Sequence, residues 1–397
     1  MRQLTLLITL LSIILIGCGS GSQRSTEVNG ITVINLSGRL PYKEIHLRDV
    51  ADIEYIALET TDDVLLGQVS IISHVSDRYI VLWDFNGNVF IFDRAGKIVS
   101  HFNHRGQGPR EYAFMTGVGA VFDEKNEEVF VFNTFANRIL VYSITGEYRR
   151  TLHIDADLDI SASSSAFSFD NETLLIYDNL PRSLDGYGHN KRPFMLLSKK
   201  DGSIVYVLDI SLPARYQTTV PHRVEVDGQT FYTTLAIGFE NNKRFGSDFV
   251  IANISSDTIY KFTQNRELTP WLVRTPSVHL SEPRAIWAHL LTTDRFTIIQ
   301  ETTLDFTAAA QRQRVPSATL IYEFETGQVS NISFVNDDFP TRAWRLSYTD
   351  KNTAVSLIQA ADLIVAYEDN LLKGELKEFV TTIDEEDNPV VMIVRFR

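Results

Sequence analysis

Few residues of this sequence have the type and spacing that catalysis or cofactor binding requires. His101 and His104 are three residues apart, and residues 384–387 form an acidic run. The histidines stand at the end of a strand-like run, where this spacing has no meaning for a metal, and an acidic run is typical of a solvated turn. The glycines in residues 106–108 are followed by Pro109, and the third glycine of a dinucleotide fingerprint is missing. We therefore expect no catalytic residue, no metal and no cofactor from these motifs.

The local signatures of the common enzyme classes are also missing. The sequence has no Gly-x-Ser-x-Gly elbow, no His-Glu-x-x-His helix, no Cys-x-x-Cys pair and no Gly-x-x-x-x-Gly-Lys loop. The net charge of −13 argues against a nucleic-acid partner, because proteins that bind nucleic acids carry basic stripes. A non-enzymatic protein is the expectation, and an enzyme is the alternative.

A loop at residues 104–112, HRGQGPREY, could bind a ligand through exposed side chains. In a functional interpretation, Arg105, Gln107, Arg110 and Glu111 project hydrogen-bond donors and acceptors from one face of the protein. In a structural interpretation, the glycines permit a tight turn and Tyr112 packs in the core.

A second candidate segment, residues 211–248, is basic and aromatic within an acidic chain. We predict that Arg215, Arg223 and Arg244 lie near the open rim of the fold, within reach of Arg105 and Arg110. There they would attract an acidic glycan or a carboxylate. The alternative is that residues 233–239 form an inner strand and that the charges are paired.

Five aromatic residues outside the strand runs could stack on sugar rings or fill the core: Tyr187, Trp271, Trp287, Trp344 and Tyr348.

The elements that must position these residues are short strands. Residues 127–151 contain two β-branched and aromatic runs and the start of a third, separated by turns of Asn, Ser and Gly. Similar pairs of runs begin at six positions along the chain: Ile80, Val129, Leu174, Phe249, Phe296 and Leu363.

Three of the five intervals between these positions are close to 47 residues, and one four-stranded propeller blade takes about 40–50. The two longer intervals require insertions, at residues 211–248 and 327–362. We therefore predict an all-β fold, a six-bladed β-propeller with four-stranded antiparallel blades. A seventh blade is the alternative if an insertion hides a degenerate one. Residues 371–381 are predicted to form a short helix or a loop.

An enzyme with this fold would gather its metal ligands from inner strands, one per blade, at the axis. The segments predicted to line the axis are residues 69–74, 117–122, 161–169, 235–240 and 288–293. Of these, residues 117–122 offer no ligand and residues 161–169 offer only hydroxyls. This weighs against a metal-dependent, lactonase-like hydrolase or lyase, which is the alternative to a binding protein.

The N-terminus has the pattern of a secretory signal. Arg2 precedes an apolar stretch at residues 4–16, which is shorter than the roughly 20 residues that span a bilayer. Cys18, the single cysteine of the 397 residues, follows it, and then comes a stretch rich in Gly and Ser. We divide the chain into a signal peptide (1–17), a flexible tether with a first strand (18–50) and the propeller (51–397).

The motif Leu-Ile-Gly-Cys at residues 15–18 resembles the bacterial lipoprotein signal, in which the cysteine is acylated. Residues 105–112 and the runs after them resemble an NHL repeat. Nearly the whole chain resembles the six-bladed β-propeller lipoproteins of Bacteroides and relatives, through residues 54–60, 105–112, 257–260, 268–270 and 387–390. Arg110 and Ala57 depart from that family's usual Gly and Pro.

The resemblance implies a monomeric propeller that is anchored in the cell envelope through a lipid on Cys18. Because no acidic run follows Cys18, we expect the outer membrane and its periplasmic face. The expected function is a scaffold that binds a ligand or protein, with a glycan, an acidic small molecule or an envelope protein as partner. The resemblance itself implies no settled activity.

Overall fold

The apolar runs form strands because β-branched and aromatic side chains pack well on both faces of a pleated sheet. In residues 127–151, for example, two runs pair as a hairpin, and residues 129–132 have no exposed surface. The structure is a computed structural model that describes residues 25–397. The exceptions within this range are residues 68, 116, 134–135, 156–157, 159, 161–165, 178–191, 213, 227–228, 238–242, 246–247, 281, 343, 345 and 351.

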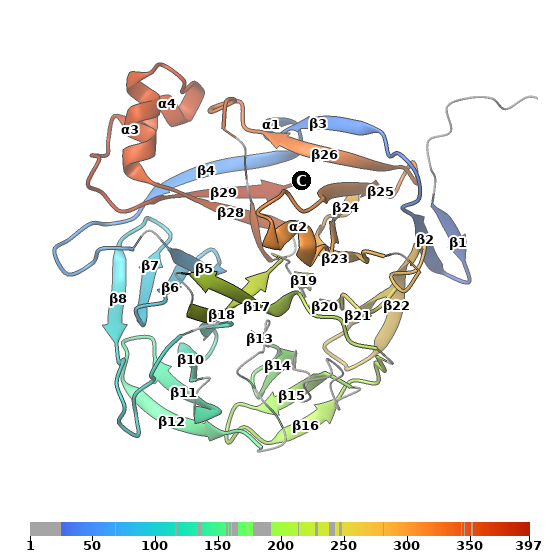
Figure 1. Ribbon diagram of the computed structural model, residues 1–397. Helices are drawn as coiled ribbons and strands as arrows, with labels where there is room; N and C mark the ends of the chain where they lie inside the picture. Colours follow the sequence, from blue (N-terminus) through green and yellow to red (C-terminus); the bar gives the residue numbers. More distant parts are fainter. Residues whose placement is uncertain are drawn as a thin grey trace, which may run out of the picture.

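Six sheets of the described chain stand around a common axis, and each runs from an inner strand to an outer one (Figure 1). We number these sheets as blades 1–6. Blade 1 contains β5 (Ser70–Val75), β6 (Tyr79–Asp84), β7 (Asn88–Asp93) and β8 (Ile98–Asn103). Blade 2 contains β9 (Ala120–Asp123), β10 (Glu128–Asn133), β11 (Arg138–Ser143) and β12 (Tyr148–His153). Blade 3 contains β13 (Ala166–Ser168), β14 (Thr173–Tyr177), β15 (Phe194–Ser198) and β16 (Ile204–Val207).

The other three blades include strands from the N-terminal segment. Blade 4 contains β19 (Lys243–Phe245), β20 (Asp248–Ile251), β21 (Thr258–Phe262), β22 (Leu268–Thr275), β2 (Ile31–Asn35) and β1 (Thr26–Val28). Blade 5 contains β23 (Ala285–Thr292), β24 (Phe296–Thr303), β25 (Ser317–Glu323), β26 (Val329–Val335) and β3 (Tyr42–His46). Blade 6 contains β27 (Ser347–Asp350), β28 (Thr353–Ile358), β29 (Val390–Phe396) and β4 (Ala51–Ala57). The predicted all-β propeller with four-stranded antiparallel blades is confirmed.

The N-terminal segment runs along the outer edges of three blades. β2 and β3 pair in parallel with β22 of blade 4 and β26 of blade 5. After α1 (Leu47–Val50), β4 pairs antiparallel with β29, so strands from the two ends of the chain close the ring. The blades thus include β1, β2 and β3, which lie before the predicted propeller boundary at residue 51. Pairing along an open strand edge uses backbone groups, and it needs no apolar run that a sequence would reveal.

The apolar core lies in layers between successive blades. Between blades 1 and 2, for example, Val81 and Trp83 pack with Val129 and Val131 in one buried cluster. Gly119 faces the Trp83 ring with a φ of +63°, and a Cβ at this position would collide with the indole. The alternation of apolar side chains on both strand faces thus builds the ring, and it leaves the inner strands around the axis.

The two ends of the ring differ in what they carry. Because neighbouring strands of a blade are antiparallel, the turns from the first to the second strand lie at one end, which we call the turn face. The connections from the outer strand of one blade to the inner strand of the next lie at the other end, the crossover face. The hairpin of β17 (Thr219–Val226) and β18 (Gln229–Ala236) belongs to such a connection. It crosses the middle of the ring in Figure 1 and contacts α2 (Phe306–Ala310).

The prediction placed the second strand of the last blade at the wrong residues. The run that begins at Leu363 is not a strand but part of α3 (Ala360–Glu368), and the second strand of blade 6 is β28. In α3 the buried residues are Ala360, Leu363 and Ala366, which are three apart and lie on one helix face. A four-residue apolar run cannot reveal this period. Residues 371–381, predicted as a short helix or a loop, contain the helix α4 (Gly374–Val380).

No helix of the described chain has the length and apolar character that a membrane span needs.

Candidate functional site

A cavity of about 560 Å³, which we call the axial cavity, lies where the inner strands β5, β9 and β13 converge. Thr349 of β27 completes its wall. The wall is apolar at Ile71, Phe122 and Phe167, whereas its rim is formed by charged and polar residues of the first turns of blades 1–3. The cavity therefore opens on the turn face, and its volume is within the range of about 300–1,000 Å³ typical of ligand sites.

His74 and Glu124 form a hydrogen-bonded pair on the rim of this cavity. His74 is near the end of β5 and Glu124 follows β9, so adjacent blades bring the two side chains together. His74 Nε2 lies 2.9 Å from Glu124 Oε2, and the imidazole also meets the edge of Phe122. The hydrogen bond from His74 is the main cause of the lowered pKa of Glu124. The pair thus presents an oriented imidazole and an ionised carboxylate to the cavity.

Arg78 adds an exposed cation to the same rim. Its guanidinium Nη2 lies 3.2 Å from Glu127 Oε1, and Nη1 lies 3.9 Å from Glu124 Oε1. The guanidinium also stacks on the Tyr79 ring, 4.8 Å from the centroid. Because its side chain is more than half exposed, these pairs are screened by water, and Arg78 can exchange them for a ligand.

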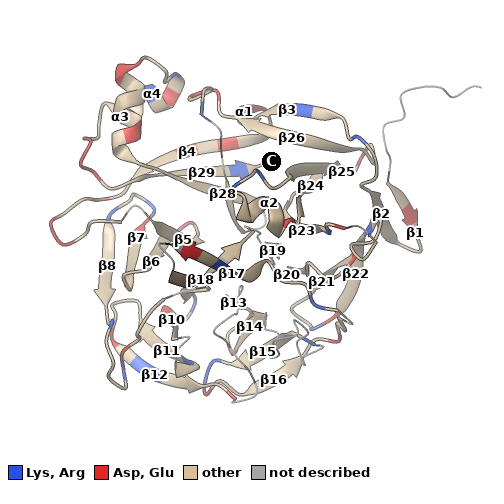
Figure 2. Cartoon of the chain, in the orientation of Figure 1, with Lys and Arg blue, Asp and Glu red and all other residues tan. Residues whose placement is uncertain are grey.

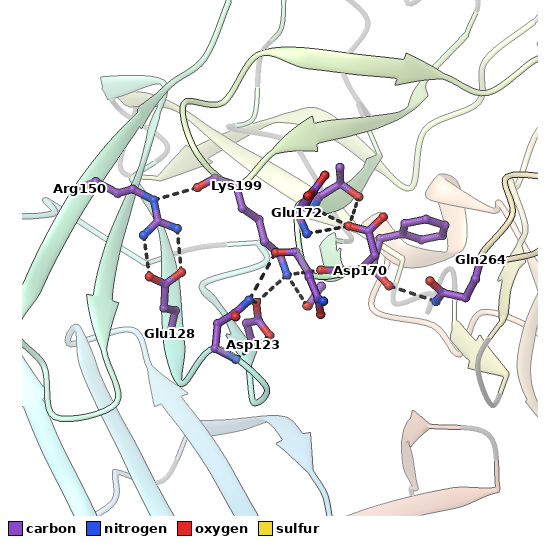
Figure 3. Close-up of polar contacts among 12 residues, drawn as sticks. Asp123, Glu128, Arg150, Asp170, Glu172, Lys199 and Gln264 are labelled. Atoms are coloured by element: carbon purple, nitrogen blue, oxygen red, sulfur yellow. Dashed lines mark hydrogen bonds and ion pairs between the residues drawn. The ribbon is translucent and has the colours of Figure 1, made fainter.

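A buried polar cluster forms the wall between blades 2 and 3 (Figure 3). Lys199 Nζ lies 2.6 Å from Asp123 Oδ2, and it donates to Ser168 Oγ at 2.8 Å and to the Asp170 carbonyl at 2.5 Å. Lys199 is 3% exposed and Asp123 is 4% exposed. Burial lowers the pKa of Lys199, although Asp123 opposes this shift. Arg150 Nε donates to the Lys199 carbonyl at 2.8 Å. These groups bond to each other, so the cluster joins the two blades, and Asp123, Ser168 and Asp170 also line the axial cavity.

A smaller cavity of about 350 Å³ lies between blades 6 and 1. It shares Ile71 and Ile72 with the axial cavity, and it is lined by Ser70 and Ser347 at the starts of two inner strands. It therefore lies toward the crossover face, opposite the rim that carries His74.

The described residues contain no group of three or more His, Cys, Asp or Glu side chains placed to hold a metal ion. Four of the five segments predicted to line the axis overlap observed inner strands: β5, β9, β13 and β23. The fifth, residues 235–240, does not, because the inner strand of blade 4 is β19.

The loop at residues 104–112 takes the structural role that was one of its two interpretations. Tyr112 is buried between blades 1 and 2, and its hydroxyl donates to the Gly87 carbonyl at 2.7 Å. Glu111 accepts a hydrogen bond from the Gly108 backbone inside the loop. Arg105 and Arg110 are exposed and stack on Phe114 and Tyr148.

The four candidate residues of this loop, Arg105, Gln107, Arg110 and Glu111, are all exposed, and none of them lines either cavity. A role for them in ligand binding stays a prediction.

The three arginines of the 211–248 segment do not form one described cluster. Arg215 is 7% exposed, and its guanidinium lies 5.7 Å from the centre of the Tyr177 ring. Arg215 is therefore buried against an aromatic neighbour, and its role in ligand binding stays a prediction. Arg223 is exposed on β17 and pairs with Glu225 at 2.6 Å. Arg244 is in β19, opposite Phe249, and its side chain is outside the described atoms.

The aromatic candidates are partly buried in the core and partly stacked on cationic side chains. Trp287 and Tyr348 are buried in the core, and the indole nitrogen of Trp287 donates to the Ser256 carbonyl. Lys261 stacks on Trp271, and Arg342 stacks on Trp344. Tyr187 and Cys18 lie outside the described residues.

Sequence reasoning missed Arg78 and Glu124, and it included His74 only as the end of a segment to inspect. The available signal was their position, since each of the three stands at the end of an inner strand or in the turn after it.

The fold is similar to that of solved proteins from Bacteroides. A candidate exported protein from Bacteroides fragilis has a TM-score of 0.61 at 14% identity, over 92% of this chain and 100% of that one. A member of the DUF4221 family from Bacteroides vulgatus has a TM-score of 0.46 at 9% identity, over 88% and 98%. Virginiamycin B lyase from Staphylococcus aureus has a TM-score of 0.35 at 12% identity, over 86% and 99%. At these identities the first likeness shows the fold alone, and the other two carry no argument.

No curated protein matches the chain. A family model described as a domain of unknown function, DUF4934, matches residues 31–395, which include strands of all six blades. The chain therefore belongs to the DUF4934 family.

Proposed function

We propose that the protein is a lipid-anchored envelope protein that binds a short glycan in the axial cavity and acts as a binding protein. The observation that supports this most directly is the make-up of the cavity. Its walls carry the flat apolar rings of Phe122 and Phe167, and its rim carries His74, Arg78 and Glu124. An apolar wall with a few oriented polar groups is typical of small-molecule sites. A sugar ring presents an apolar face and a set of hydroxyls, so it matches both parts.

The anchor belongs to the same proposal. Cys18 follows a short apolar segment, and the described chain starts seven residues later at Ser25. A lipid at Cys18 would hold the propeller at the membrane, with the axial cavity free to meet envelope glycans.

Isothermal titration calorimetry with two disaccharides tests the binding site. The ligands are cellobiose, which is neutral, and a disaccharide of hexose and glucuronic acid. His74→Ala should weaken binding of both, and Arg78→Ala should weaken the acidic one by about tenfold or more, because a charge-assisted hydrogen bond is lost. The matched control is Arg149→Ala, because Arg149 of β12 is also exposed and pairs with an acidic residue, Glu147.

Equal affinity in the wild type and both rim variants would contradict the site, as would no heat of binding for either disaccharide at millimolar concentration. Circular dichroism of each variant shows whether a loss of binding comes from loss of the fold.

One observation favours a second function, a hydrolase or lyase. An imidazole that is oriented by a carboxylate, as His74 is by Glu124, has the geometry of a general base. If the protein is an enzyme, mass spectrometry of the acidic disaccharide after incubation will show a cleaved product, and His74→Gln will abolish it without lowering Tm. Binding without any product would support the binding protein.

A further inference from the structure

Two phenylalanines are exposed at the crossover face, where blades 1 and 2 meet. Phe85 is 47% exposed in the turn between β6 and β7, and Phe114 is 42% exposed just after the loop at residues 104–112. The turn and the loop are in contact, because a Cβ at Gly87 would lie 3.2 Å from the Cβ of Arg105. Neighbouring exposed apolar side chains with polar groups around them mark interaction surfaces.

Arg105 and Arg110 add two cations to this surface. The guanidinium carbon of Arg105 lies 4.6 Å from the centre of the Phe114 ring, and that of Arg110 lies 5.1 Å from the centre of the Tyr148 ring. Both arginines are exposed, and within the described chain neither forms an ion pair. On a chain with a net charge of −13, two unpaired arginines in one loop are a local positive charge that attracts an acidic partner.

The acidic residue of the loop, Glu111, does not neutralise these cations. Its Oε2 accepts a hydrogen bond from the Gly108 backbone at 2.8 Å. The loop is also fixed to blade 2, because Arg138 Nη2 donates to the carbonyls of Gly108 and Glu111, at 3.2 and 3.0 Å. The Tyr142 hydroxyl donates to the Arg110 carbonyl at 2.6 Å. A partner therefore meets arginines that are already held in place, and little conformational entropy is lost on binding.

We propose that Phe85, Phe114, Arg105 and Arg110, which we call the crossover patch, dock a partner protein through a segment with both acidic and apolar side chains. The carboxylates of that segment bind the planar guanidinium groups, and its apolar side chains pack on the phenylalanines. A glycan fits this surface less well, because a sugar ring stacks on an open aromatic face and Arg105 already occupies one face of Phe114.

The position of the crossover patch favours a protein over a membrane. The Ser25 backbone N–H donates to the Gly327 carbonyl, in the turn between β25 and β26 of blade 5. A lipid at Cys18, as proposed above, would be at most about 25 Å from Ser25, given roughly 3.5 Å per extended residue. The patch lies on blades 1 and 2, across the ring from blades 4 and 5 (Figure 1). It therefore faces away from the anchor, and its function does not depend on glycan binding in the axial cavity.

Fluorescence polarisation with three labelled synthetic peptides tests the proposal on the full folded chain. The first peptide, Glu-Asp-Leu-Glu-Phe-Asp-Leu-Glu, is acidic and apolar. The second has Gln and Asn in place of Glu and Asp, and the third has Ser in place of Leu and Phe. The first peptide should bind, and each of the other two should bind about tenfold more weakly or worse, because it lacks one of the two kinds of contact. Added salt should weaken binding of the first peptide.

The double variant R105Q/R110Q should weaken binding of the first peptide about tenfold or more. Its Tm should stay unchanged, since both guanidinium groups are exposed and form no ion pair in the described chain. R39Q/R314Q is the matched control, because it also removes two exposed arginines that have no ion pair there, and both lie in segments next to blades 4 and 5. Phe85→Ser should weaken binding of the first peptide and leave that of the third unchanged.

Three results would overturn the proposal: the uncharged peptide binds as well as the first, R105Q/R110Q binds the first peptide like the wild type, or R39Q/R314Q loses as much affinity. A loss of peptide binding in His74→Ala would place the peptide in the axial cavity and would also refute this surface. Binding to phosphatidylglycerol vesicles that R105Q/R110Q abolishes, without binding of the first peptide, would assign the patch to a membrane instead.

Discussion

Lys199 shows how a single side chain couples two blades. It lies in the turn between β15 and β16 of blade 3, yet its ammonium group is bonded to Asp123 of blade 2 and to Ser168 and the Asp170 carbonyl of its own blade. Both charged groups are buried, so water cannot solvate the remaining one if its partner is removed. Replacing one partner of this pair therefore leaves an uncompensated charge inside the fold.

Lys199→Met should lower the free energy of unfolding by about 3–5 kcal/mol, because Asp123 then stays buried without its counter-ion. Lys199→Met with Asp123→Asn should lose less, since no charge is left unpaired. Urea unfolding followed by tryptophan fluorescence measures both. The control is Lys200→Met at the exposed neighbouring residue, with an expected change of about 0.5 kcal/mol or less. A single variant as stable as the control would show that the pair contributes nothing.

At the residue scale, the sequence could name the buried Tyr112 but not the rim of the axial cavity. Tyr112 stands in a motif whose glycines and proline define a turn, so its structural role could be stated beforehand. His74 and Glu124 are 50 residues apart in sequence. They meet because both stand at the end of an inner strand, and that becomes visible only when adjacent blades are in place.

Among the elements, the closure of blade 6 depends on one side chain near the C-terminus. Asn388 is buried just before β29, where its Oδ1 accepts from the Leu66 backbone. Its Nδ2 donates to the carbonyls of Glu59 and Val64, and all three distances are 2.8 Å. The segment it holds follows β4, so Asn388 joins the last strand of the chain to the loop after the N-terminal closing strand.

Asn388→Ala should therefore lower the free energy of unfolding by about 2–4 kcal/mol, since one backbone donor and two carbonyls lose their partners inside the fold. Thermal unfolding followed by circular dichroism gives the effect. Asn86→Ala, at an exposed turn of blade 1, is the control and should leave Tm unchanged. If both variants melt together with the wild type, Asn388 does not hold the closure.

Elements of the blades were more predictable than those that connect them. The second strands of blades 1–5 fall on the predicted apolar runs, because buried runs of β-branched and aromatic residues leave few alternatives to a strand. The structure of the connecting segments depends on features that a run of apolar residues does not show. β2 and β3 are bound by parallel backbone pairing along blade edges, and α3 uses a short apolar run that also suits a strand.

The whole molecule carries charge mainly outside its blade strands, which are largely tan in Figure 2, whereas the β17–β18 hairpin has both acidic and basic segments. The N-terminal segment covers the outer edges of blades 4, 5 and 6, and such covering of open edges prevents pairing with other chains. The described chain begins at Ser25, whose backbone N–H donates to the Gly327 carbonyl of blade 5 at 2.8 Å.

Cys18→Ser should release the protein from the membrane fraction and leave the propeller folded. The reason is that the lipid would be attached outside the blades, since every described strand begins at Thr26 or later. Fractionation of cells followed by immunoblotting measures the release, and Tm of the purified variant shows that the ring is intact. Cys18→Ser protein that still sediments with the outer membrane would contradict a lipid anchor.

Taken alone, the sequence determined that the chain forms a ring of antiparallel blades, because strand runs with a period near 47 residues can bury both of their faces only against like neighbours. It also determined the signal-like N-terminus, and it offered a tight turn as one of two interpretations of residues 104–112. Only the tertiary structure decided which polar groups meet: Lys199 with Asp123, His74 with Glu124, and Asn388 with the backbone of residues 59–66. These contacts depend on strand register and on the order of blades around the axis, and no local pattern of residues encodes either one.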